Sequence, residues 1–378
     1  MSSGGTGGAK LHQASPAQGP SVLVVGCGQI CDAHVVESRR AGGRVVAVCD
    51  TSPAMAEQAA ARLAVPAAFT DLATALAEAR PEVVHVTTPP ATHLPVALRA
   101  LEQGAHVYVE KPLTVDAREA AVLAEAARRR GLLVCPGHNL VLDPAVRRLR
   151  ELAAAGGLGE VVHAEAVMGY DLSGPFGALA MADPDHWVHR LPGGLAHNNL
   201  SHPLSLVLPY LGPDAPEVVA VGRRLRPARH GDARDLFHDE IRVLLSGPRA
   251  TAGVLFSCRI RPAQLALHVY GTGRAAWASL DARTVRLTGG SRSPGPFQKV
   301  EWAWREAWDA AAEALARAGD LARARLHYFE GMRALFQAFY RAVRGEGAPP
   351  EPVAQALPAA EVLDRIFERC REAEERAA

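Results

Sequence analysis

Short apolar runs alternate with amphipathic, alanine-rich stretches along roughly the first 140 residues of the chain. The apolar runs hold almost no polar position, as expected for parallel strands covered on both faces. They occupy residues 22–25, 45–49, 83–87, 106–109 and 132–135. Helical spacing of apolar positions occurs between them, at about residues 30–41, 53–64, 71–79, 93–103 and 116–130. This alternation predicts right-handed crossovers and an α/β fold with a doubly wound parallel sheet.

The pattern changes after about residue 143. A helix at 144–155, a strand at 161–168 and an apolar helix at 195–211 precede a series of strands joined by short links. These strands are expected at residues 217–221, 240–245, 251–258, 265–270 and 283–287. Consecutive strands of this kind favour a mainly antiparallel sheet. Two helices, at about 322–344 and 359–374, are expected to end the chain.

These patterns predict two consecutive domains. An α/β domain is expected over residues 21–142 and an α+β domain over residues 143–378. The first 20 residues are small and polar, without the apolar core of a secretory signal, so we expect a disordered arm there.

Composition excludes several classes of protein. Hydrophobic residues make up 48% of the 378 positions and charged residues 21%, which is typical of a globular chain and excludes a wholly disordered one. The formal net charge is +1, so no overall field attracts nucleic acid or a membrane surface. No apolar run approaches the roughly 20 residues that span a bilayer. The six cysteines form no CxxC pair, so a reducing, cytoplasmic location is expected.

A glycine-rich turn, GCGQIC at residues 26–31, follows the first predicted strand and opens a helix. In a dinucleotide-binding turn the first glycine makes the bend and the second admits pyrophosphate to the backbone, while the third position must be small. Cys31 stands at that third position in place of Gly or Ala. The pyrophosphate would lie on the helix N-terminus. The expected cofactor contacts here are Gly26, Gly28, Gln29 and Ile30, and the alternative is a purely structural turn.

Asp50 ends the second predicted strand, about 20 residues beyond Gly28, as expected for a carboxylate that binds ribose hydroxyls. Such a carboxylate repels a 2′-phosphate. Asp50, with Thr51 beside it, therefore favours NAD(H) over NADP(H). The alternative is an aspartate that only caps the following helix.

Two more segments lie at carboxyl ends of predicted parallel strands, where open α/β sheets bind ligands. They are TTPPATH, at residues 87–93, and Glu110-Lys111-Pro112. Together with VLVVGCGQICDAH, VVAVCD and GGLAHNNLSHPLSLVLPYLG, they resemble the Gfo/Idh/MocA family, which contains inositol dehydrogenases, glucose-fructose oxidoreductase and sugar-nucleotide dehydrogenases. The resemblance covers residues 21–370. It implies an N-terminal Rossmann domain and a second sheet whose open face is buried in a homodimer or homotetramer.

The resemblance also implies roles for single residues. Lys111 becomes the catalytic-site lysine and Glu110 a contact of the cofactor ribose. An ammonium beside a reacting hydroxyl favours loss of the hydroxyl proton and can relay that proton. The alternative is an exposed Glu-Lys pair at a strand end. The residues expected to border the nicotinamide half of the cofactor are Thr87, Thr88, Pro89 and His93.

The family's second-domain motif places an aspartate and a histidine four residues apart after a glycine pair. Here these positions hold Asn198 and His202, which share one face of a helix unless Pro203 disturbs it. His202 is the expected general base. Asn198 holds no charge, but it can orient the substrate or His202 by hydrogen bonds. The alternative for His202 is a histidine packed or capped on an apolar helix.

Further candidates are expected to contact the substrate. Trp187 offers an aromatic face for a sugar, with Tyr170 and His186 as possible hydrogen-bonding partners. Their alternative is an exposed loop without a binding role. Zinc is not expected at His186 and His189, because no cysteine or further ligand cluster accompanies them.

His138 and Asn139 are polar groups near the end of the fifth predicted strand and complete the expected substrate contacts. The family often carries an arginine-aromatic pair before a proline in this region. This chain has VLDP there, at residues 141–144.

The sequence thus predicts an NAD(H)-dependent oxidoreductase. It would move a hydride between nicotinamide and a secondary alcohol or ketone carbon of a sugar, aminosugar or cyclitol. Two alternatives stay open: an NAD-dependent glycoside hydrolase of the same family, and a non-catalytic dinucleotide-binding regulator.

Overall fold

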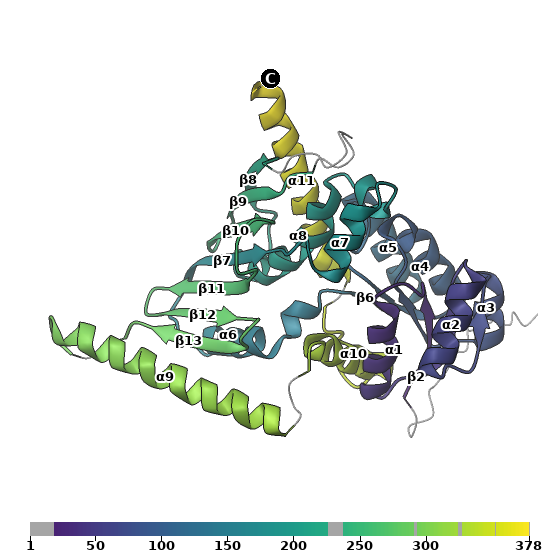
Figure 1. The fold of residues 1–378 in the computed structure, drawn as a ribbon, viewed down its shortest axis with the longest axis horizontal. Helices are drawn as coiled ribbons and strands as arrows, with labels where there is room; N and C mark the ends of the chain where they lie inside the picture. The colour runs from purple at the N-terminus through teal and green to yellow at the C-terminus, as the bar shows by residue number, and fades with distance from the viewer. Residues whose placement is uncertain (1–18, 226–236, 291–292, 324–326, 352, 378) are drawn as a thin grey trace, which may run out of the picture. The chain divides into compact units, whose positions relative to one another are not determined.

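The computed structural model describes residues 19–225, 237–290, 293–323, 327–351 and 353–377 (Figure 1). The arm predicted over residues 1–20 lies outside the described residues except for its last two positions. The chain divides into two compact units whose ranges are interleaved. Unit 1 comprises Met1–Glu110, Ala121–Pro136 and Leu335–Val353, and unit 2 comprises Lys111–Ala120, Gly137–Ala334 and Ala354–Ala378. Two consecutive ranges were expected instead.

Unit 1 is built on a parallel sheet with the strand order β3-β2-β1-β4-β5-β6. β1 and β4 are buried along their whole length, as their continuous apolar runs predict. The strand order reverses between β1 and β4, and ligands of open α/β sheets bind at such a switch point. The predicted doubly wound sheet is therefore confirmed. The strands are β1 (Ser21–Val25), β2 (Arg44–Cys49), β3 (Ala68–Phe69), β4 (Val83–Val86), β5 (His106–Val109) and β6 (Val134–Pro136).

Helices connect these strands and cover the sheet of unit 1. They are α1 (Cys31–Arg40), α2 (Pro53–Leu63), α3 (Leu72–Ala79), α4 (His93–Glu102) and α5 (Ala117–Arg130). Side chains at helix starts satisfy free backbone N–H groups, as Ser52 does for α2 and Asp71 for α3. A late segment also belongs here, because α10 (Glu330–Val343) buries Phe336, Phe339 and Tyr340 in unit 1.

Unit 2 contains a second sheet with the order β13-β12-β11-β7-β10-β9-β8. Its neighbouring strands pair antiparallel, except that β7 and β10 run parallel. Buried and exposed residues alternate along β8 and β9. One face of this sheet is therefore covered within unit 2, and the other face is exposed. The expected mainly antiparallel sheet is confirmed. The strands are β7 (Val161–Gly169), β8 (Glu217–Arg223), β9 (Glu240–Ser246), β10 (Thr251–Ser257), β11 (Leu265–Gly271), β12 (Ala275–Ser279) and β13 (Thr284–Thr288).

Five helices of the described residues belong mainly to unit 2. They are α6 (Pro144–Ala154), α7 (Pro175–Ala182), α8 (Gly194–Val207), α9 (Phe297–Ala322) and α11 (Val353–Ala377). α8 is buried along almost its whole length and packs on β7 and β10. α7, α9 and β12 were not expected, and the helix predicted over 322–344 is wrong at its start, because α9 ends at Ala322 and α10 begins at Glu330. None of the helices in the described ranges has the length and apolar character that a membrane span requires.

Candidate active site

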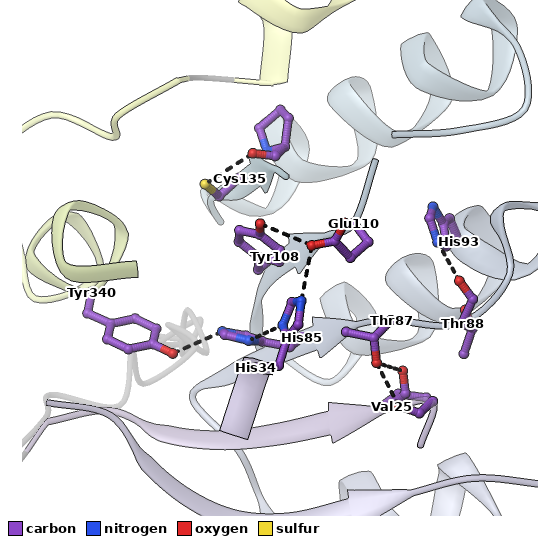
Figure 2. A network of polar contacts seen from close by, with 12 residues as sticks. Val25, His34, His85, Thr87, Thr88, His93, Tyr108, Glu110, Cys135 and Tyr340 are labelled. Carbon is purple, nitrogen blue, oxygen red and sulfur yellow. Dashed lines mark hydrogen bonds and ion pairs between the residues drawn. The ribbon is translucent and has the colours of Figure 1, made fainter. Parts of the chain in front are cut away.

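Close contacts with the end of β4 fix the glycine turn that follows β1. Gly26 has a φ of +102°, and a Cβ atom there would lie 2.7 Å from the Thr87 carbonyl carbon, so this position requires glycine. The Thr87 hydroxyl donates to the carbonyl oxygens of Val25 at 2.9 Å and Gly26 at 2.7 Å (Figure 2). These bonds tie the end of β4 to the turn. Thr87 thus fixes the backbone of the glycine turn.

The same turn is open where a ligand would approach. No atom lies within 4 Å of a Cβ built on Gly28, and Gln29 is exposed. Ile30 is the N-cap of α1 and supplies no side-chain hydrogen bond to the first N–H groups of the helix. Cys31 is fully buried, so its small thiol meets the need for close packing between helix and sheet. Open space beside an uncapped helix N-terminus fits the pyrophosphate of the predicted dinucleotide.

Asp50 is fixed against this turn. Its Oδ2 accepts a hydrogen bond from Cys27 N at 2.7 Å, and its Oδ1 accepts one from Ser52 N at 2.9 Å. The N-cap of α2 is Ser52, whose hydroxyl accepts from Met55 N. Asp50 is therefore not the cap of α2. Its half-exposed carboxylate lies next to the glycine turn, where the ribose role predicts it, while the adjacent Thr51 is exposed.

Thr88, Pro89 and His93 form a second structured turn, after β4. His93 is buried, and its Nε2 lies 2.8 Å from the Thr88 carbonyl oxygen (Figure 2). Since a carbonyl only accepts, Nε2 of His93 carries a hydrogen and donates it. The Thr88 hydroxyl oxygen is buried and has no hydrogen-bond partner among the described residues. His93 thus holds the turn, and Thr88 retains a hydroxyl that can bond to a ligand.

Glu110 is the end of a buried chain of polar side chains in unit 1, which sequence reasoning did not find (Figure 2). His34 Nε2 lies 3.0 Å from Glu110 Oε1, and His34 Nδ1 lies 3.0 Å from His85 Nδ1. His85 Nε2 lies 3.0 Å from the Tyr340 hydroxyl, which lies 2.8 Å from the Ser38 hydroxyl. We call these five residues the Glu110 chain. Burial, with a smaller contribution from His34, lowers the pKa of His85 well below its ordinary value.

The acceptor at one end is consistent with one direction of hydrogen bonding along the Glu110 chain, in which each histidine carries a single ring hydrogen. The Glu110 carboxylate accepts, so His34 donates from Nε2, and in this tautomer it accepts at Nδ1. His85 therefore donates from Nδ1 and accepts at Nε2. Tyr340 donates its hydroxyl hydrogen to that nitrogen and accepts from Ser38. In this arrangement every donor is directed toward Glu110, which stabilises the negative charge of the carboxylate and fixes its orientation.

Lys111 and Asn198 are brought together within unit 2. The Lys111 ammonium donates to the Asn198 carbonyl oxygen at 3.3 Å and to its side-chain Oδ1 at 3.4 Å. Asn198 lies in the buried helix α8, which starts at the glycine pair. A Cβ on Gly193 would lie 2.1 Å from the Phe367 ring, so α11 can pack here only against glycine. The family motif did not predict this contact between Asn198 and the lysine.

His202 lies one helical turn after Asn198 in α8, which continues through Pro203. The spacing of four residues places both on one face, and the His202 side chain is half-buried. The neighbouring polar residues make other contacts. His197 stacks on Phe367 with ring centroids 5.3 Å apart, and burial lowers its pKa to about 4, while Asn199 bonds to the Leu195 carbonyl.

The predicted substrate contacts fall into separate groups in unit 2. His186 and Trp187 lie side by side with ring centroids 5.2 Å apart, and Phe176 of α7 packs on both, a residue the sequence did not single out. Burial lowers the pKa of His186. Tyr170 is half-buried at the end of β7, and burial raises its pKa to about 12. Its ring makes no described contact with that aromatic cluster.

His138 is buried, and the adjacent Asn139 has a buried Oδ1 without a hydrogen-bond partner in the described chain. Gly331 of α10 packs closely on Asn139, because a Cβ there would lie 2.5 Å from its carbonyl oxygen. His189 donates from Nε2 to the Ala180 carbonyl at 2.8 Å. Within the described ranges, no three metal-ligating side chains lie together.

Two sequence profiles match most of the chain. Residues 21–138 match an oxidoreductase family with an NAD-binding Rossmann fold. Residues 146–276 match the GFO/IDH/MocA C-terminal domain.

Similar proteins include an uncharacterized oxidoreductase, YdgJ, of Escherichia coli, 27% identical over 77% of this chain and 79% of its own length. An inositol 2-dehydrogenase of Gluconacetobacter diazotrophicus is 35% identical over 44% of this chain and about half of its own length, 51%. Among solved structures, a levoglucosan dehydrogenase in complex with NADH and levoglucosan superposes with a TM-score of 0.76. That match covers 93% of this chain and 97% of the other at 18% identity, so it concerns the fold.

Proposed function

The chain belongs to the Gfo/Idh/MocA family of NAD-binding oxidoreductases, and from that premise we propose the reaction it catalyses. It transfers a hydride between the nicotinamide of NAD(H) and a secondary alcohol or ketone carbon of a sugar, aminosugar or cyclitol. The observation that carries this proposal is the Lys111 ammonium held by Asn198, one helical turn before His202. An imidazole in such a position can accept the proton of a substrate hydroxyl, and the ammonium can stabilise the oxygen that is left.

Unit 1 provides the residues that would hold the cofactor. The open backbone at Gly28 and the start of α1 suit the pyrophosphate, and the Asp50 carboxylate suits a ribose. Thr88 follows β4, where the family resemblance predicts the nicotinamide half, and Glu110 follows β5, where it predicts a contact with the cofactor ribose. When bound, NAD supplies the hydride acceptor or donor.

Unit 2 provides the proton chemistry. In the oxidation direction His202 would accept the hydroxyl proton of the substrate, while the Lys111 ammonium stabilises the oxygen as its negative charge develops. In the reduction direction the proton returns by the same path. Asn198 positions the ammonium through its two oxygens, and as a neutral amide it contributes no negative charge of its own.

A polyhydroxylated substrate agrees with the relatives, since one of them is an inositol 2-dehydrogenase. We place the substrate ring against Trp187, with His186, Tyr170, His138 and Asn139 as candidate hydrogen-bonding partners. The six cysteines are free and buried, which supports a cytoplasmic enzyme. The exposed apolar residues on the sheet of unit 2, such as Val219 and Leu244, support a homodimer or homotetramer.

The reaction is tested by substitution at the two proton-handling residues. We expect Lys111→Ala and His202→Ala each to lower kcat by about 10²–10⁴-fold on a substrate found in a polyol and aminosugar panel. NADH binding, followed by fluorescence titration, should persist. Lys299→Ala is the matched control, because this lysine is exposed on α9. Wild-type turnover in either active-site variant would exclude the assignment, and sugar release without net NADH would indicate the hydrolase instead.

Cofactor choice is tested by titrating the protein with NADH and NADPH. Because the Asp50 carboxylate repels a 2′-phosphate, NADH should bind at least about tenfold more tightly. Asp50→Ser should reduce that preference. Tighter binding of NADPH to the unaltered protein would contradict the role given to Asp50.

A further inference from the structure

α9 carries an apolar stripe that lies exposed in the described structure. The stripe consists of Phe297, Val300, Trp304, Trp308 and Leu315, and its two tryptophans are 73% and 76% exposed. At about 100° per residue these positions fall on one face of the helix. We call them the α9 stripe. A row of large apolar side chains of this kind marks an interaction surface.

The opposite face of α9 is bound to its own sheet. Glu313 accepts a hydrogen bond from Val285 N of β13 at 2.8 Å, and Arg317 donates to the Arg283 carbonyl at 3.2 Å. Figure 1 shows α9 running beside β13 at the edge of the sheet. Glu313 and Arg317 lie about half a turn around the helix from the α9 stripe. The stripe is therefore directed away from this sheet.

Four of the five residues of the α9 stripe have the same spacing in both chain directions. Trp304 and Trp308 lie symmetrically about residue 306, as do Phe297 and Leu315. In an antiparallel pair of identical helices centred on residue 306, Trp304 would oppose Trp308 of the partner subunit. Phe297 would likewise oppose Leu315 of the partner subunit. Because of this symmetry, the α9 stripe of a second copy can pack against the stripe of the first.

Small residues allow the two helices to approach. Ala307, Ala311 and Ala318 flank the stripe along one side. The distance between packed helices depends on the side chains at the contact, and alanine permits a short one. Bulky side chains can then interdigitate across the axis.

We propose that the α9 stripe pairs with the stripe of a second copy of this chain across a two-fold axis. Buried aromatic side chains contribute about 150–250 Å² each. Three aromatics with Val300 and Leu315 bury about 600 Å² per copy, or about 1,200 Å² in total, which reaches the lower bound of stable interfaces. A self-complementary surface closes with two copies. The inference names one contact of the homo-oligomer proposed above and does not depend on the reaction.

The test measures the mass of the full chain by sedimentation over a range of concentrations. Trp304→Ala/Trp308→Ala should weaken the pairing of two copies at least about 100-fold, because central aromatic residues dominate such contacts. Trp302→Ala, on another face of the same helix, is the matched control and should leave the pairing unchanged. Circular dichroism and thermal midpoints should show that all variants remain folded.

A second experiment tests the geometry. Trp304→Cys mixed with Trp308→Cys should give a disulfide-linked pair under mild oxidation, whereas each variant alone should give little. Linking of each variant with itself would indicate a parallel pair and overturn the proposed axis. A chain that is monomeric at every concentration would overturn both the pairing and the homo-oligomer. An oligomer unaffected by the double alanine substitution would overturn the α9 contact alone.

Discussion

The carboxylate of Glu110 has two described donors, His34 Nε2 at 3.0 Å and the Tyr108 hydroxyl at 3.4 Å. Burial is the largest of the effects that raise the pKa of Tyr108, so its phenol stays protonated and able to donate. The family resemblance implies that Glu110 contacts a ribose, and the structure adds the polar side chains that contact Glu110.

Tyr340→Phe tests the contribution of the Glu110 chain to stability. It removes the donor to Nε2 of His85 in a fully buried place, so we expect the free energy of unfolding to fall by about 1–3 kcal/mol. Ser38→Ala is the matched control, because it leaves the bond from Tyr340 to His85 in place, and should cost about 0.5–1.5 kcal/mol. Urea unfolding of the three proteins gives the comparison. A larger cost for Ser38→Ala would contradict the central place of Tyr340 in the Glu110 chain.

Among the helices and strands, those with distinct hydrophobic spacing were predicted from the sequence. The five strands expected in the first domain were found, because continuous apolar runs bounded by glycine or proline have few alternatives. α9 was not predicted, although its apolar residues recur at helical spacing; in the structure they are exposed rather than packed on the sheet. The parallel pairing of β7 with β10 was also not foreseen, since strand order depends on contacts between distant segments.

At the scale of the whole molecule, the boundary between the two units does not fall at the single point where the sequence pattern changes. Residues 335–353 belong to unit 1, where Phe336 lies 4.6 Å from His85 and 4.9 Å from Tyr108 between ring centroids. A C-terminal helix thus completes the core of the N-terminal unit. The sequence pattern indicated that the last helices pack through an apolar face, but not against which sheet.

A fragment of residues 21–142 tests this arrangement. Without α10 it would expose His85, Tyr108 and the apolar surface around them, so we expect no sharp thermal transition. Residues 21–136 fused through a flexible linker to residues 335–353 should regain one. Circular dichroism on heating provides the measurement. A cooperative transition in the shorter fragment, at the same temperature as the fusion, would show that α10 is not needed.

The amino-acid sequence alone determined the fold class and the glycine turn with Asp50, since these depend on local pattern and short spacing, and its resemblance to a known family pointed to Lys111, Asn198 and His202 as candidates. Tertiary structure decided which side chains meet. The pairing of Lys111 with Asn198, the Glu110 chain and the placement of α10 join positions far apart along the chain. Such contacts are set by packing of the folded core, which no window of neighbouring residues contains.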